Sequence, residues 1–190
     1  MFNKSQINYM KKLLLVSLLS LLAFSCSDKL TESKTEKLIN ECLEIDPLYG
    51  KGIIKTGKIS FSSDEDKLKM EDLVKKGLIL TEDKEDKGSL FNSKYTLVSL
   101  TDKAKPYILE SKESYGGNTI HKVMLYSKKI DKIGSIQEIP SMNIAEVTVT
   151  FLKDNKTPFY DALEQDKTDF ETKKISLKKT ENKGWVYCEK

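Results

Sequence analysis

An apolar run near the start of the chain, Leu13–Phe24, limits how much of the sequence can contribute to a fold. Lys11 and Lys12 precede it directly, and its length of about a dozen residues is typical of a secretory signal. The run is shorter than the roughly 20 apolar residues of a membrane-spanning helix, and no second such run follows. Removing 25 of the 190 residues leaves 165, enough for one domain with an ordinary core.

The end of this run, Leu22-Ala23-Phe24-Ser25-Cys26, resembles the lipobox of bacterial lipoproteins. In that family a small residue before the cysteine allows cleavage, and the cysteine then carries acyl chains on its sulfur and its amine. The resemblance implies that residues 1–25 are a lipoprotein signal peptide and that Cys26 is the lipidation site. Phe24 is bulkier than the residue usual at its position. An ordinary cleaved signal with a chance cysteine and a short core helix are the alternatives.

Lipidation of Cys26 would place the domain in the cell envelope, outside the cytoplasm. A single acyl chain binds a membrane weakly, whereas two or more hold a protein there stably, so the membrane is an expected partner. Ser27 follows the cysteine where the inner-membrane retention signal of enteric bacteria has aspartate, which favours an outer membrane. Met10, directly before the two lysines, is a candidate start of translation beside Met1.

The charge of the chain argues against a nucleic-acid partner. The net charge of +3 comes from Lys4, Lys11 and Lys12, so the chain after residue 25 has 29 lysines against 29 acidic residues. A neutral domain has no general field to attract a polyanion. Every basic residue is lysine, which lacks the planar fork with which arginine reads guanine or phosphate.

The three cysteines suggest one disulfide. If Cys26 is lipidated, Cys42 and Cys188 remain as a pair. Exported proteins fold in compartments that can be oxidising, so a bond between Cys42 and Cys188 would connect the first helix to the last strand. Two separate buried thiols are the alternative.

The first part of the mature chain is predicted to be helical. Residues 26–35 are polar and read as a tether, and Ser33 with Glu36 fits a capping box for the helix that follows. Within the helical part, 36–113, the segments LKMEDLVKKGLI and YTLVSLTDKAKPYI resemble part of a winged helix, covering 68–109. This resemblance implies a helix, a small sheet and a further short helix that opens at Thr101.

The second part, 118–190, is predicted to be an antiparallel sheet. Paired glycines precede it, and Ala145–Phe151 alternates apolar with polar residues, which is typical of a half-buried strand. The last stretch, ISLKKTENKGWVYC, looks like the final hairpin of small secreted α+β lipoprotein domains, including cystatin-like ones. The expected fold class is therefore α+β: N-terminal helices with a small winged-helix-like sheet, then a C-terminal antiparallel β-sheet.

The sequence contains few residues that indicate catalysis. His121, the sole histidine, cannot build a multi-histidine metal site and is predicted on a strand surface. No nucleophile, phosphate-loop or calcium-loop motif is present, and no cofactor or metal is expected. Six aromatic residues could line a ligand groove or pack in the core: Tyr49, Tyr115, Tyr126, Tyr160, Trp185 and Tyr187.

These observations favour a non-enzymatic envelope lipoprotein with a binding or structural role and an unidentified envelope protein as partner. A periplasmic immunity or inhibitor lipoprotein is the first alternative. A hydrolase that uses a pair of carboxylates is the second, because acidic residues are plentiful.

Overall fold

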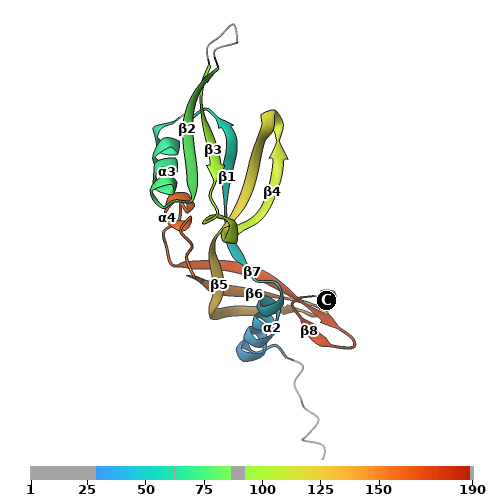
Figure 1. The fold of residues 1–190 in the computed structure, drawn as a ribbon. Helices are drawn as coiled ribbons and strands as arrows, with labels where there is room; N and C mark the ends of the chain where they lie inside the picture. The colour runs from blue at the N-terminus through green and yellow to red at the C-terminus, as the bar shows by residue number, and fades with distance from the viewer. Residues whose placement is uncertain (1–28, 62, 87–92, 189–190) are drawn as a thin grey trace, which may run out of the picture.

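One antiparallel sheet of eight strands forms most of the protein (Figure 1). The computed structural model describes residues 29–61, 63–86 and 93–188. The strands are β1 (Tyr49–Ile59), β2 (Ile79–Asp86), β3 (Ser93–Leu100), β4 (Ile108–Ser114), β5 (Asn118–Ile139), β6 (Ile144–Asp154), β7 (Phe170–Thr180) and β8 (Gly184–Val186). The α-helices are α2 (Glu32–Ile45), α3 (Asp64–Lys75) and α4 (Tyr160–Leu163), and the 3-10 helices are η1 (Lys105–Tyr107), η2 (Tyr115–Gly117) and η3 (Pro140–Met142).

Strand β5 belongs to both halves of the sheet. The strand order is β2-β3-β1-β5-β6-β7-β8, and β4 pairs with the first part of β5, on the edge opposite β1. Bulges interrupt the pairing at Gly50–Lys51 and at Ile130–Lys132, and a bulge bends and twists its strand. Figure 1 shows β5 passing from an upper half, with β1–β4 and α3, to a lower half, with β6–β8 and α2.

Each half has its own hydrophobic core, and the helices pack on these cores. In the upper half, Ile54 and Val123 of the sheet pack with Leu73 of α3 and with Phe159, just before α4. In the lower half, the alternating buried residues of β6 pack with Ile39 of α2 and with Trp185. The helices therefore cover one side of the sheet and leave the exposed side chains of the strands on the other.

Helix α2 begins earlier than the sequence pattern predicts. Thr31 is the N-cap, and its hydroxyl accepts a hydrogen bond of 3.2 Å from the backbone N–H of Lys34. The predicted capping box of Ser33 and Glu36 is therefore wrong, since both residues lie inside the helix. Leu30, just before the cap, is buried, and its N–H donates to Oε1 of Glu138 at 2.9 Å. The chain is thus bound to the lower half of the sheet from residue 30 onward.

The predicted α+β arrangement with a winged-helix-like sheet is wrong, because the structure is mostly antiparallel β-sheet. Helix α3 is followed by β2 and β3, but β3 also pairs with β1 and belongs to the eight-stranded sheet. The helix expected from Thr101 is only the short η1, and β4 starts at Ile108. Pro106 lacks an N–H and disfavours a continuing helix, whereas Ile108 pairs with Val123 of β5. Residues 114–118 form the turn between β4 and β5.

Candidate functional site

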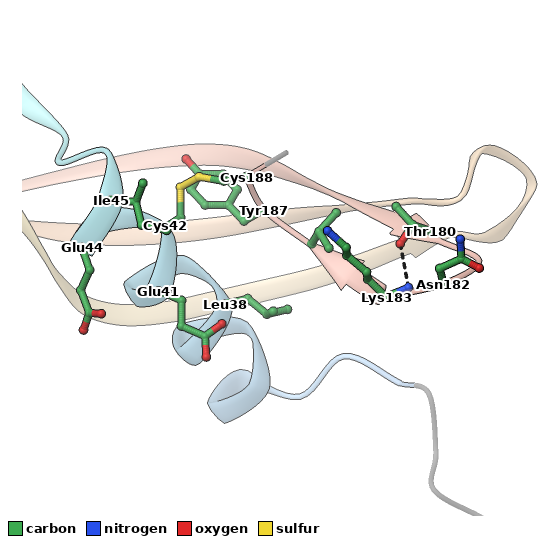
Figure 2. Close-up of a pocket in the computed structure, with 11 residues that line it drawn as sticks. Leu38, Glu41, Cys42, Glu44, Ile45, Thr180, Asn182, Lys183, Tyr187 and Cys188 are labelled. Atoms are coloured by element: carbon green, nitrogen blue, oxygen red, sulfur yellow. Dashed lines mark hydrogen bonds between the residues drawn. A yellow bond between two sulfur atoms is a disulfide. The ribbon is translucent and has the colours of Figure 1, made fainter. Parts of the chain in front are cut away.

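A groove of about 680 Å³ runs between α2 and the C-terminal hairpin. In Figure 2, the side chains of α2 line one wall and those of the β7–β8 hairpin and the residues after it line the other. The lining residues are Leu38, Glu41, Cys42, Glu44, Ile45, Thr180, Asn182, Lys183, Val186, Tyr187 and Cys188. Both walls come from elements of the lower half, so the groove lies in the lower half of the molecule.

Helix periodicity and one covalent link build this groove. Leu38, Cys42 and Ile45 recur at helical spacing, so they lie along one side of α2. Cys42 and Cys188 are joined by a disulfide, with Cα atoms 5.7 Å apart and a sequence separation of 146. Figure 2 shows this bond at the wall of the groove. The bond connects the end of the chain to α2, which orders the hairpin wall against the helix wall.

The groove combines an apolar lining with charged side chains. Ile45 is 60% exposed although it is a large aliphatic residue. Glu41 lies 3.9 Å from Lys37, an exposed i,i+4 pair of the kind that contributes little to stability. Burial raises the pKa of the Tyr187 phenol, so this group is neutral at ordinary pH and can donate a hydrogen bond to a ligand. The arrangement suits binding of a ligand that is part apolar and part polar.

A buried ion cluster lies where the two cores meet, beyond the C-terminal end of α2. The ammonium of Lys153, whose side chain is 2% exposed, donates to the carbonyl of Asp166 at 2.6 Å and lies 3.9 Å from Glu164. Lys128 and Lys173 contact Glu171 at 2.6 and 2.7 Å. The residues of this cluster on β5, β6 and β7 lie on the same side of the sheet as the buried apolar residues that the helices cover. They lie beyond the end of that apolar stretch.

Within the ion cluster, two lysines hold the pKa of Glu171 below its ordinary value. Burial by itself would raise the pKa of Glu171, but hydrogen bonds from Lys128 and Lys173 lower it below its ordinary value. A general acid needs the opposite shift, a raised pKa that keeps its proton near neutral pH. Burial also raises the pKa of Tyr126, whose hydroxyl donates to Glu171 at 3.3 Å. The cluster therefore satisfies buried charges, as buried ion pairs require.

His121 is buried, so its predicted position on a strand surface is wrong. Its Nε2 lies 2.9 Å from the Thr56 hydroxyl on β1, and its Nδ1 lies 2.7 Å from the Ser111 hydroxyl on β4. Burial lowers the pKa of the imidazole. A serine beside a histidine resembles a nucleophile with its base, but the third group here is a hydroxyl and not a carboxylate. The three side chains connect β1, β5 and β4.

The structure brings some of the predicted residues together and separates others. Cys42 and Cys188 meet at the groove, whereas Cys26 and the signal segment lie outside the described residues. Of the aromatic residues, Tyr187 lines the groove, Tyr126, Tyr160 and Trp185 are buried, and Tyr115 is 99% exposed. The groove itself was not predicted, although the i, i+3, i+4 spacing of Leu38, Glu41, Cys42 and Ile45 is a signal for its helical wall.

Metal, membrane and family comparisons add three findings. The described part of the chain has no cluster of three or more histidine, cysteine or acidic residues that could hold a metal ion. No helix within residues 29–61, 63–86 and 93–188 is long and apolar enough to span a bilayer. Comparison with protein-family models, curated proteins and solved structures gives no match to this chain.

Proposed function

We propose that this protein is an exported lipoprotein of the cell envelope, anchored through acylated Cys26, with a non-enzymatic binding or structural role. The observation that carries the proposal is the segment Lys11–Cys26, with its basic start, short apolar run and terminal Ser25-Cys26. The absence of aspartate after the cysteine favours an outer membrane, because Ser27 occupies that position.

The start of the folded domain supports the anchor. Leu30 is buried and hydrogen-bonded to Glu138, and Cys26 lies only four residues before it. Four residues span at most about 14 Å when fully extended. Acyl chains on Cys26 would therefore hold the lower half next to the bilayer, while the upper half points away (Figure 1).

The disulfide supports export to an oxidising compartment. Disulfides persist in secreted and periplasmic proteins and are rare in the reducing cytosol. The bond between Cys42 and Cys188 encloses most of the domain. It also joins α2, which follows the proposed anchor directly, to the end of the chain, so the lower half would be held together at the membrane.

A binding role is favoured over catalysis by the surfaces that the fold exposes. The groove beside α2 is lined in part by apolar side chains, of which Ile45 is 60% exposed. In the ion cluster, by contrast, Glu171 has a lowered pKa and contacts Lys128 and Lys173. The immunity or inhibitor alternative gains support from Tyr115, which is 99% exposed at the tip of the β4–β5 hairpin. Tyrosine is enriched among the residues that contribute most of the binding energy in protein interfaces.

Replacement of the acylated residue tests the proposed function. In cells that produce the full chain, Cys26→Ser should abolish acylation and release the protein from the membrane fraction. Ser25→Ala keeps a small residue before the cysteine and should leave the protein acylated and membrane-bound. Acylation or membrane attachment that persists in Cys26→Ser would refute the anchor.

A further inference from the structure

Within residues 29–61, 63–86 and 93–188, no helix covers one side of the upper half of the sheet. Along β1, Gly52, Ile54 and Thr56 are buried, while the residues between them are exposed. Ile54 packs in the core with α3 residues, so Ile53, which is 62% exposed, points to the opposite side. The register with β5 and β4 extends this side over three strands.

We define the open face by the residues that share this side. They are Lys51, Ile53 and Lys55 of β1, Ile120, Lys122 and Met124 of β5, and Glu110 and Lys112 of β4. In the register, Lys122 pairs with both Ile53 and Glu110, and Ile120 pairs with both Lys55 and Lys112. The open face thus contains two rows of paired residues that cross all three strands. A third row, formed by Lys51 and Met124, crosses only β1 and β5.

The open face carries excess positive charge in a domain that is neutral as a whole. Its four lysines face one carboxylate, Glu110. A hydrogen bond from Lys122, 2.6 Å long, lowers the pKa of Glu110, and the nearby charges of Lys112 and Lys51 lower it further. Lysines from all three strands therefore gather around a single acid. A local excess of one charge attracts a partner surface of the opposite charge.

The open face also has an exposed apolar centre. Ile53 lies between Lys51 and Lys55 on its strand, and Ile120 and Met124 beside it are partly exposed. At the edge of the same hairpin, Tyr115 is 99% exposed, three residues from Lys112. Aliphatic and aromatic side chains surrounded by charged residues are typical of protein interfaces, in which an apolar centre has a polar rim.

We propose that the open face, together with Tyr115, docks an acidic surface of another protein. Carboxylates of the partner would meet Lys51, Lys55 and Lys112, and an apolar group would cover Ile53. A second copy of this chain is disfavoured, because two open faces would bring lysines against lysines. This inference deepens the binding role proposed above and rests on it, but it does not depend on the lipid anchor.

Site-specific photo-crosslinking in cells that produce the full chain tests this surface. Benzoylphenylalanine at position 53 reports on the open face, and the same residue at position 68 is the matched control. Leu68 is 64% exposed, close to the 62% of Ile53, but it lies on α3. The position-53 protein is then combined with Lys51→Glu/Lys55→Glu or with the charge-preserving Lys51→Arg/Lys55→Arg. The yield of the position-53 adduct is also measured in a protein with Tyr115→Ser.

The proposal predicts a discrete protein adduct from position 53 that position 68 does not give. The two Glu substitutions should reduce this adduct roughly tenfold, as reversal of interfacial charge does, and the Arg substitutions should retain it. Mass spectrometry should locate the crosslink on a carboxylate-rich segment. The same adduct from both positions, an adduct insensitive to charge reversal, a homodimer, or an adduct to lipid or glycan alone would overturn the proposal.

The two proposals can fail separately in this experiment. Fractionation of the same cells shows whether the protein is attached to the membrane. Retained attachment with no position-53 adduct would refute the docking surface and leave the anchor intact. An adduct with the predicted charge dependence in an unattached protein would refute the anchor alone. A urea unfolding midpoint close to that of the unsubstituted protein verifies that each variant is folded.

Discussion

In the upper half, single side chains add contacts between strands that already pair through their backbones, and His121 is the clearest case. Its ring nitrogens contact hydroxyls on β1 and β4, so one side chain connects three strands. A neutral imidazole with one donor and one acceptor suits two hydroxyl partners. Burial disfavours the charged form, which makes this residue a source of pH-dependent stability.

Acidification should destabilise the protein through His121. Burial lowers its pKa in the folded state, while the unfolded chain has the ordinary value of about 6.5. The unfolded state therefore binds more protons, so the free energy of unfolding should be level above about pH 6.5 and fall as the pH drops below it. Urea unfolding at about pH 7.5 and about pH 5.5 measures this effect. His121→Gln should remove the dependence; an equal loss in both proteins would contradict it.

Elements were predicted well where one local pattern determined them and poorly where distant pairing did. The alternation of Ala145–Phe151 predicted a strand, and β6 spans it. A helix was expected to begin the helical part after residue 35, and α2 lies there, although it begins earlier, at Glu32. By contrast, the helix expected to open at Thr101 gives way to β4 at Ile108, because the partner that makes this segment a strand is β5. Pairing between distant strands leaves little trace in the local sequence.

The N-cap of α2 gives a direct comparison between two neighbouring hydroxyl residues. Thr31 accepts the N–H of Lys34, whereas Ser33 lies inside the helix. Thr31→Ala should lower the free energy of unfolding by about 1 kcal/mol. Ser33→Ala, the control, should change it by less than about 0.5 kcal/mol. Chemical denaturation distinguishes the two, and a larger loss for Ser33→Ala would show that the helix is capped at Ser33.

The link between α2 and the chain end should be a large source of stability. Loss of a disulfide that closes so long a loop costs about 2–5 kcal/mol, so Cys42→Ser/Cys188→Ser should unfold at a clearly lower urea concentration. A reductant should shift the wild type in the same direction and leave the double variant unchanged. Non-reducing mass mapping of exported protein should recover the two cysteines in one linked peptide pair; two alkylatable thiols would exclude the bond.

At the scale of the whole molecule, the two halves have different expected roles. The lower half holds the start of the domain, the disulfide and the groove, and the proposed anchor would keep it at the bilayer. The upper half carries the open face and Tyr115, at the far end of β5. The cysteine pair of the groove could be singled out from sequence. The open face could not, because its lysines come from three strands that are separated in the sequence, and the neutral total charge of residues 26–190 gives no sign of their grouping.

Mass spectrometry of the mature N-terminus, on protein isolated from membranes, tests the central claim most directly. The account predicts an N-terminal peptide that begins at Cys26 and carries acyl chains on its sulfur and amine. A full-length chain that retains residues 1–25 with an unmodified Cys26 thiol would contradict it. In that event the envelope location, and the roles of both halves relative to a membrane, would have to be abandoned.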